Sequence, residues 1–295
     1  MSALSFDFDK VIAVKEVSRS PSSSVWKADI SDEWMIGSVP HGGYILSVIL
    51  SAASAHFAGN RPDPISINAY FLRPTAANVP AILTVTDIKA GRYSIAQIVV
   101  EQAGTATQFA TVTYGDISQE QGPTRVIDPD RLPPPSQCFP GSFGRRAPGA
   151  PKDKPHLGQK VEVLRDSQTI STTRAERRQW IRFTDGRYPD LISLGFFADA
   201  SGPLLTNFGK EWLGGECWFP TMEINIQFRA KPSITAPGRW VGQSVNSRFI
   251  TKGRHEVDVE LYDENGDIVA LARQMALVVP WERNLRNASN PAARL

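Results

Sequence analysis

Two stretches of the sequence hold residues that could do chemistry. One stretch lies at the start of an apolar helix, and the other lies within an apolar helix. The first is Pro40-His41-Gly42-Gly43, which leads into the uncharged run Tyr44 to Phe57. N–H groups in the first turn of a helix have no intrahelical acceptor, and the positive end of the helix attracts a negatively polarised oxygen. Because Gly42 and Gly43 leave room for such an oxygen, this helix start is a candidate binding site.

The second stretch holds one acid, Asp199, in an otherwise apolar segment bracketed by Pro189 and Pro203. The two prolines predict the limits of a helix. A carboxylate on an apolar helix is costly to bury and needs hydrogen bonds, for example from a hydroxyl and an amide. Two structural alternatives stay open: an acid on an exposed corner, and a cap for the turn at Ser201-Gly202.

Composition places the chain among ordinary globular proteins. It has 295 residues, 41% of them hydrophobic and 21% charged, with a net charge of +2. That balance excludes a disordered chain, and the scattered Arg and Lys residues give no reason to expect nucleic-acid binding. The apolar run from Tyr44 is shorter than the roughly 20 residues of a membrane span. It is apolar on every face, so we expect a buried helix and no membrane partner.

Several other functional classes lack their signatures. Cys138 and Cys217 have neither CxxC nor Cys/His spacing, so no metal site or disulfide framework is indicated. We find no phosphate-binding loop and no nucleophile elbow, and we expect no cofactor. The first ten residues carry acids where a signal peptide would be basic, and the C-terminal Ala-Ala-Arg-Leu departs from the peroxisomal Ser-Lys-Leu type. A cytoplasmic location is the resulting expectation.

The distribution of apolar residues predicts one buried helix and a set of strands in each half of the chain, which is an α+β fold. Period-2 alternation and β-branched residues support these strands. Strands are expected over 10–17, 25–30, 65–72, 81–89, 93–102, 107–114, 160–164, 175–183, 221–228, 240–249, 255–262 and 267–279.

The two halves are joined by a segment rich in Pro and Gly, which indicates a linker or a mobile loop. We therefore expect an N-terminal unit over 1–121, a linker over 122–158, a C-terminal unit over 159–282 and a flexible tail over 283–295.

The halves also repeat one another. The segment Ile67-Asn68-Ala69-Tyr70-Phe71 is echoed by Ile224-Asn225-Ile226-Gln227-Phe228. Gly91-Arg92 is echoed by Gly253-Arg254, and Gly104 by Gly266. The chain is thus expected to be a tandem duplication of a helix and an antiparallel sheet, each unit burying a sheet edge against its twin.

With these features in order, the sequence resembles the double hotdog family of the acyl-CoA thioesterase II type. The resemblance covers nearly the whole chain and rests on five segments: Trp34 to Gly43, Gly91 to Gly104, the Asp199 helix, Pro220-Thr221, and Asp263 to Gln274. It implies an acyl-CoA or other acyl thioester as substrate and a homodimer or other homo-oligomer as the assembly.

The resemblance also implies site residues. In that family an Asp on the second helix, a Thr on the next strand and a Gln on the last strand activate the water that attacks the thioester; the matching positions are Asp199, Thr221 and Gln274. For substrate binding we expect the helix start His41, Gly42, Gly43 and Tyr44. The backbone N–H groups of Gly43 and Tyr44 are better candidates than the His41 ring for polarising the thioester carbonyl.

The sequence departs from the family at two points, which leaves other functions open. Glu223-Ile224 stands where the family has an Asp-His pair, and His41 precedes Gly42-Gly43 where it has a Phe-like entry. One alternative is a hydratase, dehydratase or cyclase on a polyketide-type acyl intermediate, although no Asp and His lie close together after a strand. Another is a non-catalytic acyl-binding protein.

Overall fold

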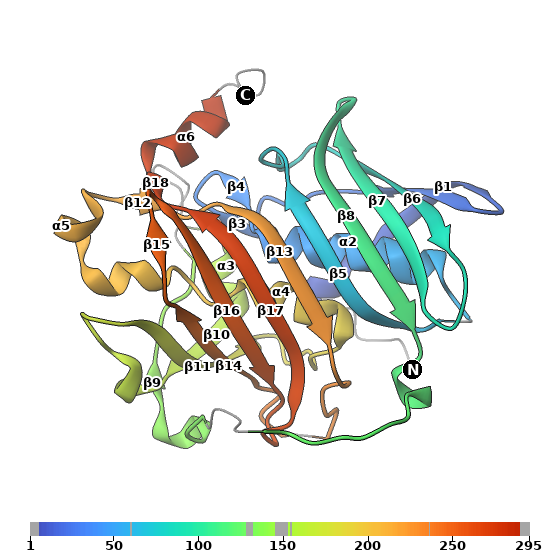
Figure 1. Ribbon diagram of the computed structural model, residues 1–295. Coiled ribbons are helices and arrows are strands. Elements are labelled where there is room, and N and C mark those ends of the chain that lie inside the picture. The colour runs from blue at the N-terminus through green and yellow to red at the C-terminus, as the bar shows by residue number, and fades with distance from the viewer. Residues whose placement is uncertain are drawn as a thin grey trace.

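The computed structural model describes residues 6–59, 61–127, 132–144, 153, 155–235 and 237–289. Its main feature is a 14-stranded antiparallel sheet that curls around two helices (Figure 1). The strands are β1 (Val14–Ser20), β2 (Ser23–Ala28), β3 (Met35–Ile36), β4 (Val39–Pro40), β5 (Asp63–Phe71), β6 (Ala81–Lys89), β7 (Ser94–Gln102), β8 (Thr105–Gly115), β9 (Phe139–Pro140), β10 (Val161–Arg165), β11 (Ala175–Phe183), β12 (Cys217–Trp218), β13 (Thr221–Phe228), β14 (Val241–Ser247), β15 (Ile250–Thr251), β16 (Arg254–Tyr262), β17 (Ile268–Leu277) and β18 (Val279–Pro280). The helices are α1 (Asp7–Val11), α2 (Gly42–His56), α3 (Leu157–Lys160), α4 (Leu191–Asp199), α5 (Lys210–Leu213) and α6 (Glu282–Ser289), with 3-10 turns η1 (Ile117–Gln119), η2 (Pro135–Gln137), η3 (Ser167–Thr169) and η4 (Leu204–Phe208). The predicted α+β class is confirmed.

The strand order shows the duplication directly. It runs β1-β2-β6-β7-β8-β5-β13-β17-β16-β14-β11-β10-β9, with β15 added against β16, so the second half repeats the first in reverse. The echoed segments lie side by side at the centre, where Asn225 is in register with Asn68 and Ile226 with Ile67 (Figure 1). The Asn225 amide also donates to Asn68 Oδ1 at 2.7 Å. Each unit therefore pairs its inner edge strand with that of its twin, as the repeat predicts.

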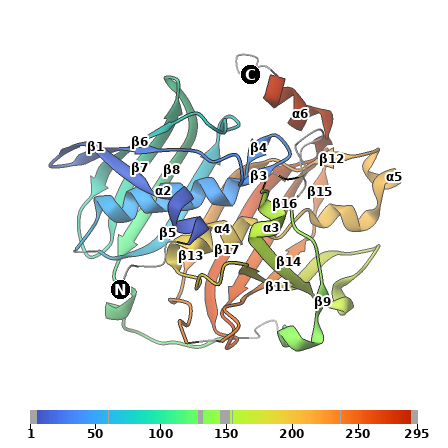
Figure 2. The same ribbon diagram turned by 180° about the vertical axis from the view of Figure 1, so that it is seen from behind.

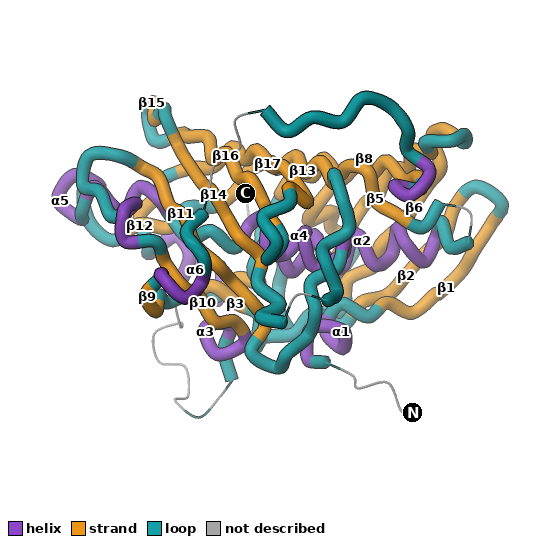
Figure 3. The backbone as a smooth tube through the Cα atoms, turned by 90° about the horizontal axis from the view of Figure 1, so that it is seen from below, coloured by secondary structure: helices purple, strands orange, loops and turns teal. Residues whose placement is uncertain are grey.

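The helices α2 and α4 lie side by side within the curl of the sheet (Figures 2 and 3). Glycines permit their close approach: a Cβ on Gly43 would lie 2.6 Å from the Phe196 carbonyl oxygen. A Cβ on Gly195 would lie 2.9 Å from Leu50. Ser47 Oγ donates to the Ile192 carbonyl at 2.8 Å, so the small polar residue of α2 is satisfied by the partner helix.

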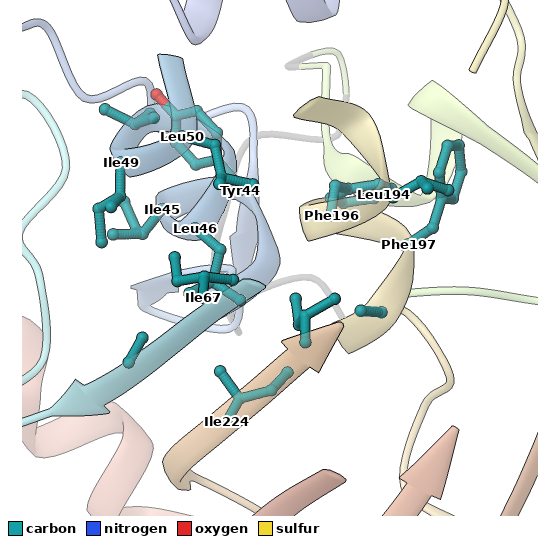
Figure 4. Close-up of a cluster of buried hydrophobic side chains, with 14 of the residues drawn as sticks. Tyr44, Ile45, Leu46, Ile49, Leu50, Ile67, Leu194, Phe196, Phe197 and Ile224 are labelled. Carbon is teal, nitrogen blue, oxygen red and sulfur yellow. The ribbon is translucent and has the colours of Figure 1, made fainter. Parts of the chain in front are cut away.

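Burial of α2 is nearly complete, as its uniform apolarity predicts. Ten of its 15 residues are buried, and each large aliphatic side chain contributes about 2 kcal/mol by leaving water. Figure 4 shows side chains of α2 and α4 packed over Ile67 of β5 and Ile224 of β13. The paired strands β5 and β13, which form the seam between the two units, thus share one core with the helices α2 and α4. This core fixes the end of α4 against the start of α2.

The first predicted strand needs a correction near the N-terminus. A strand was expected from Lys10, but Asp7–Val11 form α1 and the first strand begins at Val14. Phe8 of α1 is buried, with its ring centroid 5.0 Å from Trp34 and 4.8 Å from Phe183. One buried side chain in a five-residue helix gives too little periodicity to show in a sequence.

The expected linker and tail contain ordered contacts. In the linker, β9 pairs with β10, and Trp180 Nε1 donates to the Pro133 carbonyl at 2.7 Å. The expected tail begins inside α6, where the Asn284 side chain is fully buried and accepts from the Ser38 N–H at 3.0 Å. Residues 128–131, 145–152, 154 and 290–295 of these segments lie outside the described residues. The residues at which the two units begin and end stay a prediction.

Candidate active site

The last residue of α4 meets the first turn of α2. The Gly43 N–H donates to Asp199 Oδ2 at 2.8 Å and is shared with His41 Nδ1 at 3.1 Å. Because N–H groups of the first helical turn carry positive partial charge, this end stabilises an oxygen anion. The negatively polarised oxygen expected at this helix start is, in the structure, the carboxylate of Asp199.

Two further polar side chains reach Asp199 from the sheet. Thr221, at the start of β13, places Oγ1 3.4 Å from Asp199 Oδ1 and 3.2 Å from Gln274 Oε1. Gln274 Nε2 donates to the Ala198 carbonyl at 3.0 Å, which satisfies an acceptor that the end of α4 leaves open. The three residues assigned by resemblance are therefore brought together, although their catalytic role is not tested by this geometry.

The β17 register decides which of two neighbouring side chains faces the site. Gln274 is buried and points inward, whereas Arg273 lies on the outer face and pairs with Asp258 at 2.5 Å. A bulge between Thr221 and Glu223 interrupts the β13 register where β13 approaches α4. Strand alternation requires that only one of two neighbouring residues faces inward, and the register shows that this residue is Gln274.

The imidazole of His41 caps α2 and faces the carboxylate. His41 Nε2 lies 3.7 Å from Asp199 Oδ2, and the ring is buried. Burial lowers the pKa of His41, and the Asp199 charge opposes that shift. In a neutral ring that accepts through Nδ1, the proton is assigned to Nε2, on the side of Asp199. The ring then has no free lone pair for a substrate.

The pKa of Asp199 is raised, because burial disfavours the charged carboxylate. His41, the Gly43 N–H, Thr221 and Gln274 each act in the opposite direction. Only 12% of the Asp199 side chain is exposed. A carboxyl whose pKa moves toward neutrality is a suitable proton acceptor or donor for catalysis.

The remaining expected binding residues have different surroundings. A Cβ on Gly42 would lie 2.7 Å from Asp199 Oδ2 and 3.2 Å from the Phe71 ring, so the missing side chain keeps the carboxylate accessible. The Tyr44 side chain points away into the core, where its hydroxyl donates to the Val11 carbonyl at 3.0 Å and accepts from the Ser31 N–H. Burial raises the pKa of Tyr44 to about 12. The Tyr44 side chain is therefore part of the core, and only the backbone N–H remains a candidate for binding.

Sequence reasoning missed two polar assemblies. His56 contacts Ser24 Oγ at 2.7 Å and Asp87 Oδ1 at 3.0 Å, which ties the end of α2 to β2 and β6. The other is the pair Arg165 and Arg177, of which Arg177 donates to the carbonyl of Ser201, two residues after Asp199. Neither has a local sequence signal, because the first joins residues of α2, β2 and β6 and the second joins residues of the paired strands β10 and β11. Within the described ranges, no cluster of three His, Cys, Asp or Glu side chains could hold a metal ion, and no helix could cross a membrane.

A curled sheet of two units around two central helices, with a carboxylate where the helices meet, defines the class of the double hotdog proteins. Residues 30–115 match the family "Acyl-CoA thioesterase N-terminal domain", and residues 129–278 match "Acyl-CoA thioesterase C-terminal domain". The chain belongs to the acyl-CoA thioesterase family.

Individual relatives are distant. The chain is 26% identical to the thioesterase-like protein TwmA of Talaromyces wortmannii, over 89% of this chain and 90% of that protein. Among solved structures, it is similar to a candidate thioesterase II of Thermobifida fusca, with a TM-score of 0.78, 20% identity and coverage of 92% and 97% of the two chains. A hot dog fold protein of Alicyclobacillus acidocaldarius gives a TM-score of 0.73, 17% identity and coverage of 93% and 98%.

The same fold also carries another activity among the neighbours. The dehydratase domain of PpsC from Mycobacterium tuberculosis, solved in complex with C12:1-CoA, gives a TM-score of 0.55 at 14% identity, over 92% of this chain and 99% of that one. At such identities the similarity establishes the fold alone. The choice between the two chemistries depends on the site residues of this chain.

Proposed function

We propose that the protein hydrolyses an acyl thioester, with Asp199 as the general base. The observation that carries this proposal is the convergence of a buried carboxylate, a hydroxyl and an amide at a helix start. Asp199, Thr221 and Gln274 each come from a different element, yet their polar atoms lie within 3.4 Å of a neighbour in the group. Membership of the acyl-CoA thioesterase family supports the substrate class.

In the proposed reaction a water held by Asp199, Thr221 and Gln274 attacks the thioester carbonyl carbon. Asp199 takes the proton of the water as the new C–O bond forms. The resulting oxyanion is stabilised by N–H groups at the start of α2. The C–S bond then breaks, the thiolate leaves with its electron pair, and Asp199 returns the proton to the sulfur.

The helix start has a specific constraint in this scheme. The Gly43 N–H is already shared between Asp199 and His41, so it orients the base in the resting protein. By helix geometry, the N–H groups of Gly42 and Tyr44 have no acceptor within the helix. These groups are the donors we assign to the substrate carbonyl, with Gly43 joining them when Asp199 moves to bind water.

The test is release of free thiol from short, medium, long and aromatic acyl-CoAs, comparing the parent protein with Asp199→Asn. Asn has nearly the same shape but cannot accept a proton, so we expect kcat/KM to fall by about 1,000-fold or more. The exposed Asp29→Asn is the matched control and should keep the parent rate. Equal rates in parent and Asp199→Asn would refute the assignment.

A second candidate, dehydration of a 3-hydroxyacyl thioester, has one observation in its favour. Although the sequence shows no Asp and His close together, the structure brings His41 and Asp199 within 3.7 Å from the two units. A histidine with a lowered pKa and an aspartate with a raised pKa have the protonation states that proton abstraction and leaving-group protonation require. The occupied Nδ1 lone pair of His41 argues against it.

The two candidates separate in one experiment. A 3-hydroxyacyl-CoA is incubated with the protein, and the products are identified by mass spectrometry as free acid and thiol or as the enoyl thioester. Hydrolysis should survive in His41→Asn, since the Asn oxygen can still accept from the Gly43 N–H. Formation of the enoyl thioester that is lost in His41→Asn would establish the dehydratase instead.

A further inference from the structure

A cavity lies beside the residues that follow α4, where its lining residue Arg177 contacts the Ser201 carbonyl. Its volume is about 250 Å³, and it is lined by residues of β10, β11 and the turns at η3 and η4. The lining includes two guanidinium groups, Arg165 and Arg177, with Ser171, Thr172 and Asn207. Such a space holds several waters or one small polyatomic ion.

Arg177 is buried without a carboxylate. Only 8% of it is exposed. Its Nη1 donates to the Ser201 carbonyl at 2.7 Å, and its Nη2 lies 3.5 Å from Asn207 Oδ1. Burial and the nearby charge of Arg165 lower the pKa of Arg177 to about 10. A neutral carbonyl satisfies one donor but leaves the charge uncompensated.

Arg165 adds a second cation to the same cavity. Its Nη2 donates to the Ser142 carbonyl at 2.9 Å, and its buried Nε has no hydrogen-bond partner. Burial lowers the pKa of Arg165 as well. Bringing two like charges together out of water is unfavourable unless an anion joins them.

The lining does contain one acid, but its charge is already matched. Asp166 lies 2.9 Å from Arg178 Nε, and its other oxygen accepts from the Gln168 N–H. In the part of the chain that the structure describes, no ion pair connects Arg165 or Arg177 to a carboxylate. The cavity is therefore a site with two positive charges in excess.

We propose that this cavity binds a phosphate group through Arg165 and Arg177. The planar fork of each guanidinium matches the oxygens of a phosphate, and paired forks are the common protein solution for this anion. Ser171 and Thr172 also line this cavity. The bound anion would replace the repulsion between the two arginines with two charge-assisted contacts.

The position links this site to the reaction centre. Arg177 holds the Ser201 carbonyl, and Ser201 follows Asp199 by two residues, so the two sites lie at opposite sides of one turn. If the proposed hydrolysis holds, the phosphate belongs to the coenzyme part of the substrate; the alternative source is a free phosphate compound that acts from outside. Both sources require the same two arginines.

The first measurement is binding of inorganic phosphate by calorimetry and by thermal shift, which needs no turnover. We expect phosphate to raise the Tm of the parent and to bind about 10-fold or more weakly to Arg165→Gln. Arg177→Gln is used as the second variant and not the first, because it also removes the hydrogen bond to the Ser201 carbonyl and with it a contribution to folding. Arg174→Gln, at a position whose side chain is 67% exposed, is the matched control and should behave like the parent.

The second measurement identifies the source of the phosphate. CoA, dephospho-CoA and pantetheine are titrated into Asp199→Asn with and without Arg165→Gln. An affinity that falls as phosphates are removed, and that no longer depends on them in Arg165→Gln, assigns the site to the substrate. If Arg165→Gln leaves the affinity for CoA unchanged but abolishes phosphate binding, the cavity is assigned to a separate anion. Absence of phosphate binding by the parent, or binding by both arginine variants that is as tight as in the parent, would overturn the proposal.

Discussion

The two helix junctions of this duplicated molecule are related by the repeat, yet only one holds a carboxylate from one helix at the start of the other. Aligned on their N-caps, His41 and Asp190, the ninth residue of α2 is Leu50 and the ninth of α4 is Asp199. Leu50 is fully buried, as its counterpart nearly is. The position that holds the candidate base in one unit therefore holds an aliphatic side chain in the other.

The strands show the same replacement. Since Asn68 corresponds to Asn225, Thr221 corresponds to Pro64, and both precede a bulge in their strand. Gln274 is in register with Ile224 on β13, and Val112 is in register with Ile67 on β5. Leu50, Pro64 and Val112 thus occupy the three counterpart positions, and none of these side chains can hold a water.

The helix starts differ as well. The first N–H groups of α4 lie beside residues of their own unit: the Ser193 N–H donates to Asp190 Oδ1, and the Asp190 N–H donates to Ser193 Oγ, which is a reciprocal capping pair. Those of α2 face Asp199 of the other unit. One unit contributes the helix start and the other the carboxylate, so in the proposed function the duplicated chain has one reaction centre, whereas the second junction is part of the core.

The largest expected effect comes from moving the carboxylate to the apolar junction. Leu50→Asp should lower the free energy of unfolding by about 3–5 kcal/mol, because Pro64 and Val112 offer no donors and a buried, unpaired charge is costly. Leu50→Met, which conserves volume, should cost less than about 1.5 kcal/mol. Urea denaturation measures both. Equal stability of the two variants would show that the counterpart junction solvates a charge as well as the real one does.

A smaller effect is expected when the polar junction is made to resemble its counterpart. Gln274→Leu should lower kcat/KM by about 100-fold, since one group that positions the water is lost. It should also lower stability by about 1–3 kcal/mol, because the Ala198 carbonyl loses its donor. Arg273→Gln, on the outer face of the same strand, is the control. Parent-like hydrolysis in Gln274→Leu would leave that side chain a purely structural role.

The contrast between the junctions also explains what a sequence could and could not predict. The helix cores, most strands and the seam follow from periodicity and the repeat, because each is a local pattern. The proximity of Asp199, Thr221 and Gln274 is not local; resemblance to a family supplied it. The contact between His41 and Asp199 was missed, since it depends on how α2 and α4 pack through Gly43 and Gly195.

The smallest expected effect is a pH dependence confined to the polar junction. Burial raises the pKa of Asp199 in the folded chain above its ordinary 3.8. At pH values between 3.8 and this raised pKa, the folded chain binds more protons than the unfolded chain. Stability should then fall as pH rises through that window, by up to about 1.4 kcal/mol per unit, and level off above the folded pKa.

The comparison that isolates this term is His41→Asn against His41→Asn/Asp199→Asn, since the lowered pKa of His41 gives an opposite slope below its ordinary 6.5. As the pH rises from 3.8, the free energy of unfolding of His41→Asn, which keeps Asp199, should fall relative to that of His41→Asn/Asp199→Asn. The hydrolysis rate of His41→Asn should rise over the same range, because only the ionised carboxylate accepts a proton. A difference that does not vary with pH would mean that the four contacts to Asp199 fully offset its burial, so that the carboxyl titrates in the folded chain at its ordinary value.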